Sequence, residues 1–63
     1  MVTRTYYVPA NKLGRTVLAY IANRITCEMG YIRKVNMELA VPITLPRREI
    51  IHLEHILQMY NLM

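Results

Sequence analysis

A strict alternation of residue types runs from Val35 to Leu45, through V-N-M-E-L-A-V-P-I-T-L. Its odd-numbered positions are all apolar, and its even-numbered positions are asparagine, glutamate, alanine, proline and threonine. Side chains of a β-strand point to opposite faces with a period of two, whereas a helix would scatter these residues around its circumference. We therefore predict a strand over 35–45 that organises the fold. Pro42 has no amide hydrogen, so it predicts a bulge, a bend or a sheet edge at that point.

The small size of the chain limits how it can be stabilised. Its 63 residues predict a single domain, 1–63. A domain of this size buries only about 60% of the surface that its unfolded chain exposes. Cys27 is the one cysteine, so no disulfide can form within the chain. Hydrophobic residues nevertheless make up 54% of the sequence, and this combination favours stabilisation by a second copy. We expect a homodimer, the commonest oligomer.

A strand and a helix are predicted before the 35–45 segment. Residues 3–8 are rich in β-branched and aromatic types and indicate a strand at a sheet edge, which Pro9 ends. Asn11 is then a suitable N-cap for a helix. Apolar residues recur every four positions from Leu13 to Met29, and Gly30 is well placed to end this helix.

The last element is a second amphipathic helix that Pro46 opens, with an apolar stripe over 50–60. The predicted class is α+β, a small β-α-β-α unit of two strands and two helices. A crossover of this kind would make the two strands parallel. We expect dimerisation to complete the sheet, with the free edge of the 35–45 strand as the seam. The alternative is a helical hairpin, in which the first helix continues through Gly30 to Leu39; the alternation argues against it.

The charge of the chain favours an anionic partner. The net charge is +4 and the pI is near 9.6, which suits nucleic acid, an acidic protein surface or a membrane surface. The same charge can simply keep a hydrophobic protein soluble. The longest apolar run, 17–22, is too short to span a membrane, and no signal peptide is visible. With an unpaired cysteine, these features predict a cytoplasmic protein without membrane contact, native to the cell or carried by a virus or mobile element.

Catalytic and metal-binding patterns are sparse. The sequence has no glycine-rich phosphate loop, no G-x-S-x-G and no H-E-x-x-H. Glu49, His52 and His55 give one E-x-x-H spacing, which is most often a solvated helix face. Cys27 has no neighbour that would lower a thiol pKa. We predict no enzyme, no cofactor and no metal site.

Basic residues lie mostly where the predicted elements begin. Arg47 and Arg48 stand out, because a helix N-terminus prefers acidic residues and two arginines there suggest a nearby phosphate. The opposing interpretation is that Glu49 and a neighbouring chain neutralise them. The predicted nucleic-acid-binding residues are Arg4, Lys12, Arg15, Arg33, Lys34, Arg47 and Arg48.

These features together predict a small basic homodimeric regulatory protein that binds nucleic acid, as a DNA-binding regulator of transcription does. The alternative is a protein–protein adaptor or inhibitor that contacts no nucleic acid. Such a protein would dock through an apolar helix face or add a strand to a partner's sheet. A steep loss of affinity with salt would favour nucleic-acid binding over the adaptor, because phosphate contacts release counterions.

Overall fold

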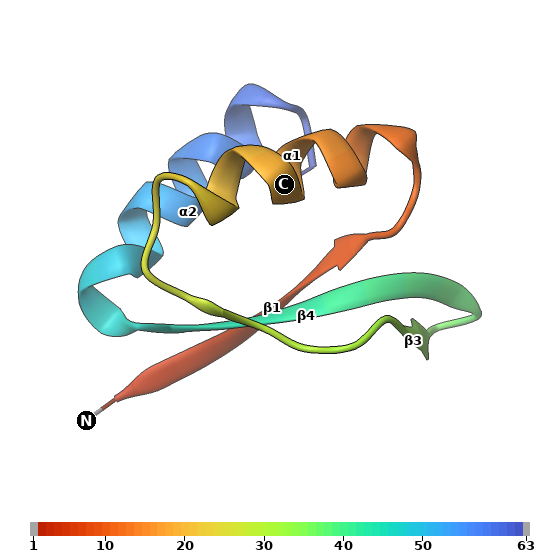
Figure 1. The fold of residues 1–63 in the computed structure, drawn as a ribbon, viewed down its shortest axis with the longest axis horizontal. Helices are drawn as coiled ribbons and strands as arrows, with labels where there is room; N and C mark the ends of the chain where they lie inside the picture. The colour runs from red at the N-terminus through yellow and green to blue at the C-terminus, as the bar shows by residue number, and fades with distance from the viewer. Residues whose placement is uncertain (1, 63) are drawn as a thin grey trace.

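A computed structural model describes residues 2–62 of the chain. An antiparallel sheet carries both helices on one of its faces (Figure 1). The fold is therefore mixed α+β, as predicted, and the alternative of a helical hairpin is wrong. The elements in chain order are β1 (Thr3–Pro9), α1 (Lys12–Ala22), β2 (Glu28–Met29), β3 (Arg33–Val35), β4 (Glu38–Pro46) and α2 (Arg47–Met59).

The sheet is built around β4. The whole of β1 pairs with one edge of β4, from Thr3 opposite Pro46 to Pro9 opposite Ala40. β2 and β3 pair with the other edge. All these pairings are antiparallel, so the expected parallel crossover is wrong and the two-strand unit is not confirmed. Because both edges of β4 are occupied, this strand cannot be the seam of a dimer.

A tight turn breaks the predicted 35–45 strand near its start. Val35 of β3 pairs with Glu38 of β4, and the two residues between them, Asn36 and Met37, have φ angles of 50° and 68°. Two consecutive positive φ angles are the mark of a type I′ hairpin turn. The strand after the turn therefore begins at Glu38, and the alternation continued across the turn because Val35, Met37 and Leu39 are all apolar.

α1 begins as predicted and ends earlier. Asn11 is its N-cap, and the Asn11 Oδ1 atom accepts a hydrogen bond of 2.7 Å from the Gly14 amide. The helix stops at Ala22 instead of Gly30. The apolar spacing extended past this point because Ile25, in the following turn, still packs in the core, while Met29 lies in β2 opposite Ile43.

Pro42 lies beside a bulge, which is one of the outcomes predicted for it. Met29 of β2 pairs with Ile43, and Arg33 of β3 pairs with Ala40. Three residues, 30–32, lie between the two paired residues on this side, but only two, 41–42, lie between their partners in β4. One extra residue on one strand defines a β-bulge. The Gly30 amide donates a 2.9 Å hydrogen bond to the Pro42 carbonyl. Gly30 therefore serves the bulge and does not end a helix.

A single hydrophobic core fills the space between the sheet and the helices. α1 and α2 also meet at Tyr20 and Tyr60, whose rings pack edge to face with centroids 6.3 Å apart. Within residues 2–62, neither helix has the length and apolar character needed to cross a membrane. The buried core consists of Val8, Val17, Ile21, Ile25, Ile43, Leu45, Leu53, Ile56 and Leu57.

Candidate nucleic-acid interface

The start of α2 carries two adjacent arginines and lacks a side-chain cap. Pro46 is the N-cap residue and offers no capping hydrogen bond, while the Arg47 amide donates to the Val2 carbonyl at 3.2 Å. Arg47 and Arg48 are both exposed. The amides of the first helical turn and the helix dipole make this end positive before the arginines are added. The local field therefore favours a bound anion.

Glu49, the acidic residue of this turn, is engaged elsewhere. One of its carboxylate oxygens accepts a 2.8 Å hydrogen bond from the Thr26 amide, which joins α2 to the loop after α1. The other lies 3.9 Å from the His52 Nε2 atom. Within residues 2–62, neither Arg47 nor Arg48 has a carboxylate within 4.0 Å. The interpretation that Glu49 neutralises the arginines by direct pairing is therefore not supported.

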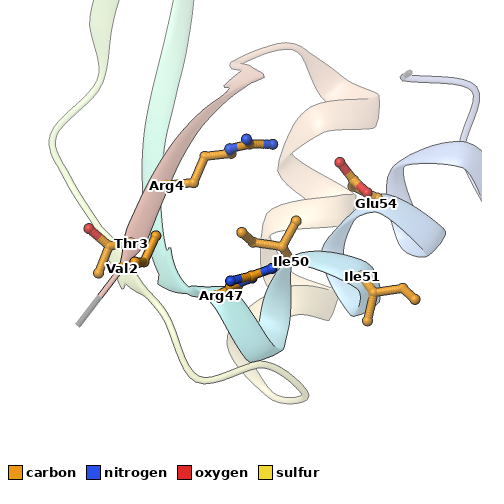
Figure 2. A pocket seen from close by; sticks show the side chains of 7 residues that line it. All are labelled: Val2, Thr3, Arg4, Arg47, Ile50, Ile51 and Glu54. Carbon is orange, nitrogen blue, oxygen red and sulfur yellow. The ribbon is translucent and has the colours of Figure 1, made fainter.

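A hollow of about 550 Å³ lies between β1 and the first turns of α2 (Figure 2). Arg4 enters it from β1 and Arg47 from α2, and Glu54 lies one helical turn beyond Ile50. The walls are partly apolar, so the hollow combines two positive charges, one carboxylate and hydrophobic surface. Its lining residues are Val2, Thr3, Arg4, Arg47, Ile50, Ile51 and Glu54.

Arg4 is already engaged within the chain. Its Nη1 atom donates a long hydrogen bond, 3.4 Å, to the Tyr6 hydroxyl, and the Tyr6 hydroxyl donates to Glu54 at 2.8 Å. The hydrogen bond to Tyr6 is the largest influence that raises the pKa of Arg4 above its ordinary value, and the Glu54 charge adds to it. Arg4 is thus a charged group oriented toward Tyr6 and Glu54, although it shares the hollow with Arg47.

Arg48 lines a second hollow, which Thr3 and Cys27 also line. Partial burial, and secondarily the Glu49 charge, raise the pKa of the Cys27 thiol. A raised pKa lowers the fraction of reactive thiolate, so this hollow does not activate a nucleophile. Arg4, Arg47 and Arg48 are consequently grouped around Thr3 at one end of the sheet.

The remaining predicted residues lie at the opposite end. Lys34 of β3 is paired with Leu39, whose carbonyl accepts a 2.8 Å hydrogen bond from Ala10, two residues before Lys12. Figure 1 shows β3 and the start of α2 at opposite ends of the long axis of the molecule, which measures 30 Å. The seven predicted residues therefore form two groups, and the distal group is Lys12, Arg15, Arg33 and Lys34.

The E-x-x-H residues of α2 line a different hollow from Arg47 and Arg48. Glu49, His52 and His55 line a shallow hollow that also includes Tyr20 and Arg24. In the described part of the chain, no three histidine, cysteine, aspartate or glutamate side chains are grouped closely enough to hold a metal ion. Arg24 lies 4.3 Å from the centre of the Tyr20 ring, which it covers as a cation–π pair.

Two features near β1 were not predicted. The hydrogen bond from Tyr6 to Glu54 joins residues 48 apart in sequence, so no local pattern could have indicated it. The second feature is a pair of threonines on the sheet face opposite the helices. The hydroxyls of Thr5 and Thr44 lie 3.1 Å apart there. Its only signal in the sequence is that Thr3, Thr5 and Tyr7 share one face of the predicted first strand.

Comparisons with protein families, with curated proteins and with solved structures find no match for this chain.

Proposed function

We propose that this chain is a small basic protein that acts as a homodimeric cytoplasmic regulator and binds nucleic acid, with Arg47 and Arg48 as its main phosphate contacts. The observation that carries this proposal is the exposed arginine pair at the uncapped start of α2, without a carboxylate partner within 4.0 Å. Positive side chains at a positive helix end destabilise the free protein by a few tenths of a kcal/mol. A phosphate removes this cost and accepts the free amide hydrogens of the first turn.

The distribution of charge favours a long polyanion over a small anion. The two basic groups lie toward opposite ends of a molecule 30 Å long. Duplex DNA carries one charge per ~1.7 Å, so a duplex of that length presents about 18 phosphate charges. A single phosphate can neutralise one group only, whereas a nucleic acid can reach both. The contacts in this proposal are to phosphate and carry no base specificity.

Fluorescence anisotropy with labelled DNA tests the proposal. A random-sequence duplex and a single strand of equal length are titrated at a low and a near-physiological salt concentration. We expect binding at low salt and a steep loss of affinity as salt rises, because each phosphate contact releases counterions. Absence of binding to both probes at low salt would overturn the proposal.

Single substitutions separate the proposed site from net charge. Arg48→Gln should lower the slope of log affinity against log salt by about 0.9 on duplex DNA, the value for one lost phosphate contact. Arg24→Gln is the matched control, because it removes the same charge from a residue that covers Tyr20. Equal losses in the two variants would show that the arginines of α2 form no specific site.

A second candidate function is that of a protein–protein adaptor, favoured by the apolar tip of the β3–β4 hairpin. Met37 in the turn, Leu39 in β4 and Ile32 just before β3 are all exposed, and Met37 is 88% exposed. Exposed apolar clusters commonly mark protein contact sites. This function predicts a protein complex whose affinity changes little with salt and is weakened by Met37→Ser.

A further inference from the structure

We propose that two copies of this chain pair through the outer edge of β1, in an antiparallel register centred on Thr5. The inference rests on the homodimer of the proposed function and identifies its interface, and it does not depend on nucleic-acid binding. β1 is the outer strand on its side of the sheet, because β4 occupies only its inner edge within residues 2–62.

The hydrogen-bonding pattern of β4 determines which backbone groups of β1 face outward. The Pro42 carbonyl points toward Gly30, away from β1, so Tyr7 and Pro42 form a non-hydrogen-bonded pair. Amide and carbonyl groups of alternate residues point to opposite edges of a strand. Tyr6 and its even-numbered neighbours therefore bond to β4, and the backbone groups of Thr3, Thr5 and Tyr7 face outward.

One register satisfies all of these outward groups. If Thr5 lies opposite the partner's Thr5, then Thr3 lies opposite the partner's Tyr7, and every outward amide and carbonyl of the three residues finds a partner. A shift of two residues in one direction would bring Pro9, which has no amide hydrogen, into the ladder opposite Thr3. A shift in the other direction would carry Tyr7 past Thr3, where the partner's β1 begins. Pro9 thus ends the pairing at one side and helps to select this register.

Charge complementarity favours a second copy as the occupant of this edge. In the same register, Arg4 lies opposite the partner's Tyr6 on the helix-covered face, in a non-hydrogen-bonded pair whose side chains approach closely. The Tyr6 hydroxyl is bonded to Glu54, so each Arg4 meets a tyrosine ring and a nearby carboxylate of the other copy. The two-fold axis repeats this contact. Arg4 therefore serves the interface, while Arg48 remains available to phosphate.

Exposed apolar side chains line the hollow beside this edge. Val2 is 64% exposed and Ile51 is 70% exposed, and both line the hollow between β1 and α2 (Figure 2). A second sheet added at β1 would lie beside this hollow and continue the sheet, with the helices of both copies on one face. The edge thus offers backbone pairing, paired charges and apolar surface to a copy of itself.

The molar mass in solution, measured by light scattering after size exclusion without nucleic acid, tests the interface. We expect the wild-type chain at micromolar concentration to have twice its monomer mass of 7.4 kDa. Arg4→Glu should give the monomer, since its carboxylate would face both Glu54 of its own chain and the partner's Glu54. The double variant Arg4→Glu with Glu54→Arg should restore the dimer.

Arg33→Glu is the matched control, because it makes the same charge change on β3 and should leave the dimer intact. A wild-type monomer at all concentrations would overturn the inference and leave the β1 edge to a strand of another protein. A dimer that persists in Arg4→Glu, or a double variant that stays monomeric, would also overturn it. Intact dimers that bind no DNA would contradict the proposed function alone.

Discussion

Gly14 lies buried in the first turn of α1, against the backbone of Pro9. Helix propensity alone predicts that Gly14→Ala stabilises the protein by up to about 1 kcal/mol. A Cβ atom at this position would, however, overlap the Pro9 carbonyl oxygen, which is backbone and cannot rotate away. We expect Gly14→Ala to lower the free energy of unfolding by about 1–3 kcal/mol, the usual range for overpacking.

Urea denaturation monitored by circular dichroism measures this change. Gly30→Ala is the control, since its added Cβ would lie 2.8 Å from the Cγ atom of the Pro42 ring, a less severe overlap than the one with the Pro9 carbonyl oxygen. The control should lose less stability. A Gly14→Ala variant that is more stable than the wild type would contradict this expectation. It would show that the backbone moves to accept the Cβ atom and that the higher helix propensity of alanine outweighs the overlap.

Met37 occupies a left-handed backbone conformation that suits glycine. Its φ angle is 68°, and the left-handed region costs an L-residue roughly 1–2 kcal/mol. The Met37 side chain is exposed, so its removal costs little packing. We expect Met37→Gly to raise the thermal midpoint, by up to about 4–8 °C per 1 kcal/mol gained in a domain of this size. Met37→Val should lower it, because a β-branched residue fits this conformation worse.

Cys27 gives a pH dependence of known sign. Partial burial, with a smaller effect of Glu49, raises the pKa of its thiol in the folded protein. The folded state therefore retains the proton longer than the unfolded state, so the thiol stabilises the fold fully below its unfolded pKa. That contribution is lost as pH rises through the folded pKa. Alkylation by iodoacetamide, followed against pH, should reach half its maximal rate at a higher pH in the native protein than in urea. Coincident curves would contradict this.

Single elements could be predicted where the signal is local. The strand Thr3–Pro9 and the N-cap at Asn11 follow from β-branched residues, a proline and an asparagine whose effects reach only a few positions. The end of α1 could not be predicted, because Ile25 is buried in a turn and keeps the helical spacing after the helix has ended. The Asn36–Met37 turn was missed because it lacks the glycine that usually marks a type I′ turn.

The N-cap residue Asn11 contributes to the stability of α1. The Asn11 side chain satisfies the Gly14 amide at 2.7 Å, and loss of such a cap costs typically about 1 kcal/mol. Asn11→Ala should therefore lower the urea midpoint, whereas Asn11→Ser should retain most of the stability because serine also caps well. Equal losses in the two variants would show that Asn11 acts through another contact.

The arginines of the candidate site could be predicted singly, but their grouping could not. Arg47 and Arg48 could be singled out, because the positive end of a helix is a local property. Their grouping with Arg4 depends on the pairing of Thr3 with Pro46, which joins residues far apart in the chain. The same pairing places β4 in the middle of the sheet, so the strand edge that can pair with another chain is that of β1. The prediction of a dimer seam on the 35–45 strand was wrong, because other strands of the chain pair with both edges of β4.

The marginal size of the fold links its stability to association. A chain of 63 residues with one core gains little stability alone, and the proposed pairing with a second folded copy would stabilise it by mass action. The thermal midpoint should therefore rise by a few degrees with each tenfold increase in protein concentration. Differential scanning calorimetry at three concentrations measures this slope.

Arg4→Glu should remove the slope, and Arg33→Glu should retain it, because Arg4 lies in β1 and Arg33 in β3. A wild-type midpoint that does not depend on concentration would mean that the folded monomer is stable by itself. In that case the core alone would offset the conformational entropy of the chain, and the exposed Val2 and Ile51 would need no second copy to cover them.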